Sequence, residues 1–270
     1  MQIVELRYRE LAECDYLAIK SRAEEILGAA VDAPAAKDGG DVVIFFHKEY
    51  SVQYTEGAVP AQTVLMTLPE PARLEAYERD VQQSWRCPGA EELLSGARYV
   101  RFVNEMMAQS LPAVERLWLF HGVLRAAIEV TRPEALVFKH TQQVIRPADY
   151  LEACEEKPIL RPGSLNVRFF NIENSAGDML MDTRGLAELG LHDLQCHYRE
   201  LDPQQVARVL MNTGVYIVEN GPVIESGQTV PGALPDSMWY CQFEDALVEP
   251  RREVLDLDPG EPYAAGNRGR

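Results

Sequence analysis

The segment that most constrains the fold runs from Asp202 to Gly221 and predicts a well-capped amphipathic helix. Asp202 suits the N-cap position, where its carboxylate accepts a free amide proton of the first turn. Pro203 follows at the first helical position, where the missing N–H costs nothing, and Gly221 suits the left-handed end of a helix. One face of this helix needs a second layer to cover it, because its apolar stripe consists of Val206, Val209, Leu210, Thr213 and Ile217.

Short alternating or apolar runs, each typical of a β-strand, lie on both sides of this helix. In the first half they are 4–8, 41–46, 50–54, 62–68, 98–105 and 135–138, with helices predicted at 15–28, 72–85, 90–95, 111–130 and 147–156. We expect the helix at 15–28 to face inward through Leu17, Ala18, Ile26 and Leu27. In the second half the predicted strands are 166–172, 179–181, 194–198, 223–224, 229–230, 238–242 and 253–257.

This interleaving of helices with several consecutive strands predicts an α+β fold. We expect two sequential α/β sandwich-like halves with mixed or antiparallel sheets, and duplicated ferredoxin-like units are one arrangement that gives this order. The exit from the helix at 147–156 has the composition of a connector, so the expected halves are 1–156 and 157–258. Residues 259–270 have the composition of a tail that packs loosely.

The acidic balance of the chain limits its classes of partner. Asp and Glu total 42 against 26 Lys and Arg, which gives a formal net charge of −16. Such a surface repels phosphate backbones, so we expect no nucleic-acid partner, and it attracts a basic protein. The charge could also serve solubility alone.

We expect no membrane association and a cytoplasmic location. No apolar run approaches the roughly 20 residues that span a bilayer, and the first residues lack the basic and apolar regions of a signal peptide. The five cysteines, which form no C-x-x-C pair, are typical of reduced, buried thiols. They are Cys14, Cys87, Cys154, Cys196 and Cys241.

Two aspartates are the first candidates for chemistry. Asp178 and Asp182 are four residues apart, so on one strand their side chains leave the same face and could hold a metal or act as acid and base. The simpler interpretation, which we favour, is that Gly177-Asp178 forms a hairpin corner and that both aspartates are structural.

The histidines and cysteines do not form a recognisable site. His192 and His197 are five apart, which places them on opposite faces of a strand, and Cys196 points away from His197. His47 and His140 have no carboxylate or thiol at a spacing that would indicate a metal or catalytic site. His121 is expected to be a packing residue on a helix.

The chain contains no nucleophile elbow, phosphate-binding loop, dinucleotide fingerprint or metalloprotease motif. We therefore assign no catalytic, metal or cofactor-binding residue, expect no cofactor, and expect that the protein is not an enzyme.

Three sets of motifs occur in the same order as in a known family. The first set consists of residues 83–93 and 99–103. The second consists of 177–183, 195–198 and 219–221, and the third of 257–260 and 265–268. They resemble the uncharacterised bacterial domain of unknown function 4261, over roughly residues 40 to 268. The first set departs from the family in its run of tryptophans, of which only Trp85 remains. The resemblance implies a bacterial source and no known reaction, and a gene context of type VI secretion and polymorphic toxins implies an immunity role.

Acidic residues gather in loops and near the C-terminus, where they form either a solvated surface or a docking surface for a cationic protein. The partner-binding candidates are Glu91, Glu92, Glu155, Glu156, Asp236, Glu244 and Asp245. Asp256, Asp258 and Glu261 belong to the same acidic set.

The function that we expect is therefore a non-catalytic acidic binding protein. Its most concrete form is a bacterial immunity protein that neutralises a secreted effector toxin, for example a nuclease. One alternative is a hydrolase that uses Asp178, Asp182 and a histidine. Another is a scaffold protein of a secretion system.

Overall fold

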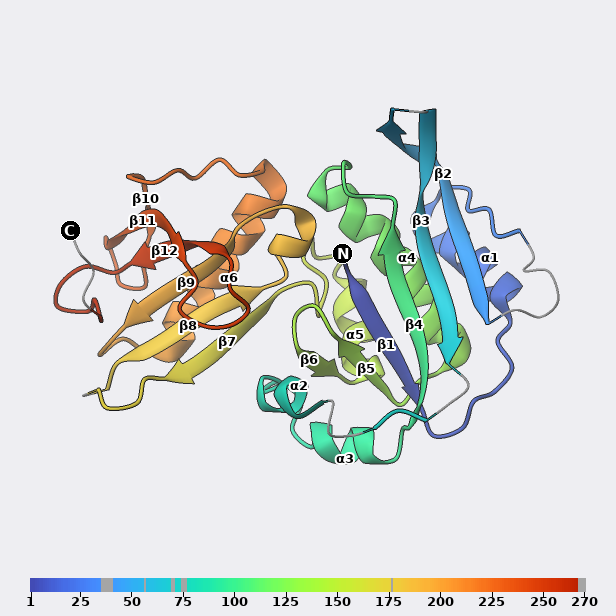
Figure 1. Ribbon diagram of the computed structural model, residues 1–270, viewed down its shortest axis with the longest axis horizontal. Coiled ribbons are helices and arrows are strands. Elements are labelled where there is room, and N and C mark those ends of the chain that lie inside the picture. The colour runs from blue at the N-terminus through green and yellow to red at the C-terminus, as the bar shows by residue number, and fades with distance from the viewer. Residues whose placement is uncertain (35–40, 56, 69–70, 74–76, 176, 267–270) are drawn as a thin grey trace. The chain divides into compact units, whose positions relative to one another are not determined.

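The computed structural model describes residues 1–34, 41–55, 57–68, 71–73, 77–175 and 177–266. The chain forms two compact units, Met1–Ser164 (the first unit) and Leu165–Arg270 (the second unit). Within these residues each unit contains a six-stranded sheet. Figure 1 labels the strands of both sheets. The expected α+β class, with two halves and antiparallel or mixed sheets, is confirmed.

The sheet of the first unit is antiparallel throughout, in the order β2-β3-β4-β1-β5-β6. Its strands are β1 Ile3–Tyr8, β2 Val42–Tyr54, β3 Gly57–Leu68, β4 Tyr99–Met106, β5 Ala135–Phe138 and β6 Gln143–Ile145. The helices of this unit are α1 Tyr16–Leu27, α2 Glu78–Gln82, α3 Ala90–Ser95, α4 Ala113–Thr131 and α5 Pro147–Glu155.

Helices α1, α4 and α5 cover one face of this sheet (Figure 1). Because strand side chains alternate between faces, Val4 and Leu6 of β1 point into this core, where they meet residues of all three helices. The other face has a smaller core near β5 and β6, where Tyr77, Ala90 and Leu94 pack against the strands.

Two expectations for the first unit are wrong. Residues 41–46 and 50–54 are not two separate strands. They belong to one long strand, β2, which pairs with β3 and has a register shift between His47 and Ser51. Such a β-bulge interrupts the alternation of side chains and therefore resembles a turn in the sequence. In α1 the buried positions are Ile19, Ala23 and Leu27, whereas Leu17 is 56% exposed.

The predicted helix at 72–85 is represented by the short α2, and residues 74–76 lie outside the described part of the chain. The remaining long helices of the first unit begin and end close to their predicted bounds.

The sheet of the second unit has the order β10-β11-β12-β9-β8-β7 and is mixed, because β9 and β12 are parallel. Its strands are β7 Asn166–Asn171, β8 Met179–Arg184, β9 Asp193–Tyr198, β10 Thr229–Pro231, β11 Met238–Asp245 and β12 Glu253–Asp258. No strand forms at 223–224, contrary to expectation, although those residues are described. The two sheets differ in strand order, so sheet topology does not display the duplication considered above.

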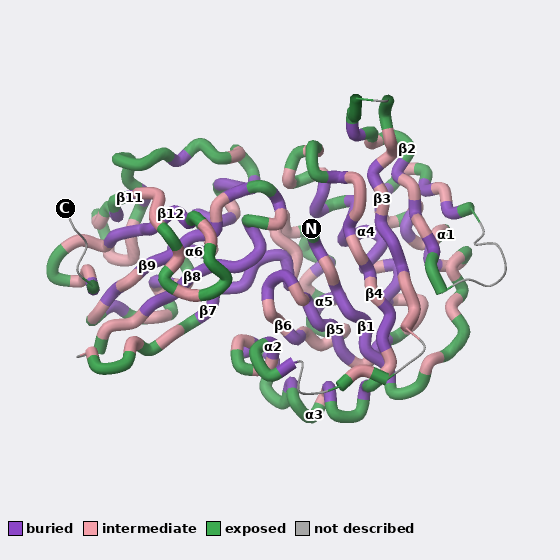
Figure 2. The backbone as a smooth tube through the Cα atoms, in the orientation of Figure 1, coloured by how far each residue is buried: buried purple, intermediate pink, exposed green. Residues whose placement is uncertain are grey.

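Helix α6, Pro203–Asn220, confirms the strongest local prediction. The amide of Gln204 donates to the Asp202 carboxylate at 3.0 Å, and the whole expected apolar stripe is buried. Figure 2 shows that buried positions are concentrated in the strands of the two sheets and exposed positions in the loops.

The residues after Pro259 pack against the end of β9 as far as they are described. Ala264 forms a β-bridge with Tyr198, the amide of Arg199 donates to the carbonyl of Tyr263 at 2.9 Å, and Ala265 is fully buried. Residues 267–270 of the expected loose tail lie outside the described residues. A search of the described helices finds none with the length and apolar character needed to cross a membrane.

Candidate functional site

The second unit has a polar sheet face on the side away from α6. The strand register places Arg168 of β7 beside Asp182 of β8, Asp182 beside Gln195 of β9, and Gln195 beside Asp256 of β12. All four side chains are buried. Because buried polar groups need hydrogen-bond partners, this face must satisfy its own charges.

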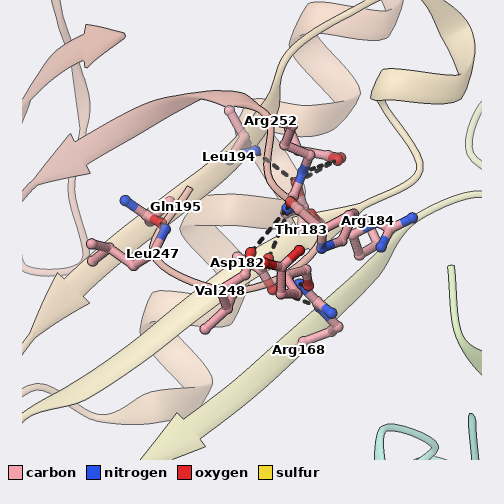
Figure 3. Close-up of polar contacts among 12 residues, drawn as sticks. Arg168, Asp182, Thr183, Arg184, Leu194, Gln195, Leu247, Val248 and Arg252 are labelled. Carbon is pink, nitrogen blue, oxygen red and sulfur yellow. Dashed lines mark hydrogen bonds and ion pairs between the residues drawn. The ribbon is translucent and has the colours of Figure 1, made fainter. Parts of the chain in front are cut away.

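Four charged groups at this face form what we call the charge cluster: the buried Arg168, Asp182 and Asp193, and the partly exposed Arg252. Nε of Arg168 donates to Oδ1 of Asp182 at 2.8 Å, and Nη2 of Arg252 donates to Oδ2 of Asp182 at 2.8 Å. Nε of Arg252 donates to Oδ2 of Asp193 at 2.9 Å. Arg252 thus bridges two carboxylates from neighbouring strands. Figure 3 shows Arg168, Asp182 and Arg252 of this cluster.

Burial perturbs the titration of groups in and beside the charge cluster. Loss of hydration raises the pKa of Asp193 to about 6, although the Arg252 guanidinium opposes this shift. Burial lowers the pKa of Arg184, against the attraction of Glu188 and Asp193. The amide of Leu186 adds a hydrogen bond to Asp193 at 3.0 Å.

The charge cluster also fixes the loop that joins β11 to β12. Arg252 donates to the carbonyl of Pro250 and to the carbonyl of Thr183, both at 2.9 Å. The amide of Leu247 donates to Oε1 of Gln195 at 2.8 Å. The loop is therefore held across the polar face, and both oxygens of Asp182 already accept hydrogen bonds from guanidinium groups.

The two aspartates singled out in the sequence have separate partners. Asp178 lies before β8 and pairs with Arg199 at 3.2 Å, whereas Asp182 lies within β8 and belongs to the charge cluster. The structure thus gives each aspartate an arginine and a local structural role.

His192 and His197 also have different surroundings. His192 lies 3.3 Å from the carboxylate of Glu253 and its ring centroid is 4.6 Å from that of Phe243. His197 lies against Gly266, which has no room for a Cβ atom beside the imidazole. Within the described residues no group of three or more His, Cys, Asp or Glu side chains could hold a metal ion.

His121 is a buried packing residue on α4, as expected. Its Nδ1 is 2.8 Å from the hydroxyl of Tyr150 and its Nε2 is 2.8 Å from Oγ of Ser164. Burial holds the pKa of His121 well below its usual value, which favours the neutral ring. A neutral ring has one donor and one acceptor nitrogen, so two hydroxyl partners satisfy both.

The acidic candidates of the first unit are exposed at two places. Glu91 and Glu92 lie in the first turn of α3, and Glu155 and Glu156 lie at the end of α5. Glu155 is already paired with Arg125 of α4, so it has less charge to offer a partner than the other three.

The acidic candidates of the second unit lie around β11. Asp236 is exposed in the turn before this strand, and Glu244 and Asp245 end it. Glu244 is half-buried, while Asp245 is exposed and its pair with Arg251 at 3.8 Å is also open to solvent.

Two further acidic residues are buried, although the sequence predicts that they lie at the surface. Asp256 and Asp258, expected in a solvated cluster, are buried on β12, with 0% and 3% of their surface exposed. The alternation of β12 explains this, since both point to the polar sheet face that the loop covers. Glu261 is exposed, as expected for a surface carboxylate.

One groove lies in the second unit, away from the charge cluster. Its volume is about 710 Å³, and it is lined by one flank of α6 and by the segment 223–224 and 228–233. Arg208, Asn212 and Tyr216 line the helical wall, and Thr229 and Val230 of β10 line the other.

Comparison with known proteins identifies part of this unit. Residues 182–258 match the family model described as Domain of unknown function (DUF4261). The resemblance is thereby confirmed for this range. No curated protein and no solved structure matches the chain.

The segment that matches DUF4261 contains Asp182, Asp193 and Arg252 of the charge cluster, together with α6 and the groove. Sequence reasoning missed Asp193 and Arg252, since isolated charges on strands and in loops carry no spacing signal. The groove had one indirect signal, the polar flank of an otherwise well-defined amphipathic helix.

Proposed function

We propose that this protein is a non-catalytic binding protein whose acidic surface docks a basic protein, and that the partner is a secreted bacterial toxin that it neutralises in the cytoplasm. The proposal is supported by the finding that burial of side chains does not remove the excess of negative charge from the surface. Among the described residues seven acidic and five basic side chains are buried, so the core removes similar numbers of each sign. The excess of negative charge therefore remains on the surface.

The second unit is the more acidic part for its size. From residue 165 onward the sequence has 17 acidic and 8 basic residues. Three of those eight, Arg168, Arg184 and Arg252, lie in or beside the charge cluster, where they face buried carboxylates. Few cations therefore remain in this unit to neutralise its exposed carboxylates, among which Asp245 has Arg251 at 3.8 Å.

An acidic surface of this kind would bind by covering a basic active site, as in a nuclease. Carboxylates pair with Arg and Lys of the partner and set the docking register, and long-range attraction speeds the encounter. The family resemblance, through its gene context, supports a toxin as the basic protein.

The test is affinity capture from the native host with the full chain as bait, followed by titration of the captured partner. We expect a basic protein at a one-to-one ratio, and binding that weakens at least tenfold when Asp236, Glu244 and Asp245 are changed to Lys. The matched control changes Glu10, Glu13 and Glu49 to Lys, because these three exposed carboxylates of the first unit are not partner-binding candidates and their reversal changes the net charge equally. Capture of no basic protein would contradict the proposal.

The same experiment separates the alternatives. A repeating assembly instead of a one-to-one complex would indicate a scaffold of a secretion system. A hydrolase would show turnover that is lost on Asp182→Asn, but the structure offers this reading less support, because Asp182 is enclosed by Arg168 and Arg252.

A further inference from the structure

The groove beside α6 has a helical wall with a regular polar flank. Gln205, Arg208, Asn212 and Tyr216 line it, and positions three or four apart lie on one side of a helix. The neighbouring stripe of α6 is buried against the sheet, so this flank is the border between core and solvent. A volume of about 710 Å³ falls in the range of sites that hold small ligands or short peptide segments.

The opposite wall is a continuous segment of the chain rather than one face of a strand. Residues 229–233 line the groove without a gap, whereas side chains of a strand alternate between faces. β10 stands at the end of its sheet and, among the described strands, pairs with β11 alone. On the edge away from β11, Thr229 has an N–H and a C=O, whereas Pro231 has a C=O only, because proline has no N–H. An added strand would therefore pair with these three groups.

The dimensions of the two walls agree. The helix rises about 17 Å from Gln205 to Tyr216, at about 1.5 Å per residue. An extended chain covers that length in about five residues.

Arg208 defines the charge of the groove. It is the one charged side chain among the described lining residues, in a unit that is otherwise strongly acidic. The residues at helical spacing from it, Gln204, Gln205, Met211 and Asn212, are neutral, and no described carboxylate forms an ion pair with it. A guanidinium in this position is suited to a carboxylate from outside the chain.

We propose that the groove binds an extended peptide segment, which adds a strand to β10 and places a carboxylate against Arg208. The side-chain amides of Gln205 and Asn212 can pair with the peptide backbone, and Val209 and Val230 offer apolar contacts. This inference goes beyond the proposed function and does not rest on it, because it requires an anionic group on the ligand and the acidic surface requires cations.

The test uses the full chain labelled with ¹⁵N and a pool of random heptapeptides with a fixed central Glu and a free C-terminal carboxylate. We expect chemical-shift changes at Arg208, Asn212 and Thr229, and much smaller changes with a pool that has Gln at the centre and an amidated C-terminus. Arg208→Ala should weaken binding of individual peptides from the pool about tenfold, as expected for a charged hydrogen bond.

Arg251→Ala is the matched control, because Arg251 is an exposed arginine of the same unit that does not line the groove. Arg208→Gln, which keeps a polar side chain of similar reach, covers the case in which the alanine variant loses stability. Absence of shifts with both pools would overturn the inference. Equal shifts with free glutarate, or equal binding by Arg208→Ala, would overturn it as well.

Discussion

Asp193 shows how burial changes the chemistry of a single residue. Its side chain is fully buried at the start of β9, where Arg252 and the amide of Leu186 donate to its oxygens. These contacts compensate for part of the lost hydration, and desolvation still raises its pKa to about 6. The sequence alone gives no sign that the Asp193 carboxylate is buried.

This shift predicts a specific dependence of stability on pH. The folded state has a pKa of about 6 and the unfolded state about 3.8, so folding favours the protonated carboxyl. The contribution of Asp193 to stability is therefore present below about pH 4 and is lost as the pH rises through 6. We expect Asp193→Asn to reduce the fall in unfolding free energy between pH 4 and pH 7 by about 2 kcal/mol.

The measurement is urea unfolding followed by the fluorescence of the buried Trp239. Trp85 and Trp118, which are 56% and 40% exposed, are first replaced by Phe so that the signal reports the second unit. Asp236→Asn is the control, because Asp236 is exposed. Identical pH profiles for the Asp193→Asn variant and its parent would contradict the prediction.

At the scale of elements, helix contacts depend on small residues that sequence patterns do not reveal. Gly122 lies within α4 where this helix meets α1. A Cβ atom at this position would approach Cδ2 of Leu27 to 2.4 Å and Cγ to 2.7 Å. In the sequence, Gly122 only weakens a predicted helix, whereas in the structure it permits the two helices to approach.

We predict that Gly122→Ala destabilises the first unit by about 1–3 kcal/mol, since overpacking outweighs the higher helix propensity of alanine. Calorimetry should then show a lower melting temperature. Gly96→Ala is the control: a Cβ atom there meets only the end of the Arg9 side chain, at 3.2 Å, and φ is −87°. A stabilising effect of Gly122→Ala would contradict the prediction, because it would mean that Leu27 can move aside at little energetic cost.

At the scale of the whole molecule, the chain consists of two units that each have a sheet and a buried interior. The second unit is of ordinary domain size, and Leu210, Trp239 and Leu257 are among its buried residues. Its polar sheet face is satisfied from within the unit by the charge cluster and by the loop from β11 to β12.

We therefore predict that a fragment of residues 165–270 folds alone. Its amide spectrum should overlay that of the same residues in the full chain, and its fluorescence should show a buried Trp239 that becomes exposed in one cooperative transition. A fragment with exposed Trp239 and poorly dispersed amides would show that the second unit depends on the first.

The sequence by itself determined the features that depend on neighbours along the chain. Helix α6 follows from Asp202, Pro203 and its apolar spacing, and the α+β class follows from the order of such local patterns. Capping and periodicity act over a few residues, so a linear sequence contains them.

Only the tertiary structure decided which charges are buried and which strands are neighbours. From the sequence, Asp256 and Asp258 belong to an acidic set expected at the surface. In the structure both are buried, because β12 pairs with β9 inside the sheet. Arg168 and Arg252 are 84 residues apart in the chain, and both donate to Asp182. Such contacts depend on strand order and register, which are set by the packing of the entire unit and not by the residues adjacent in sequence.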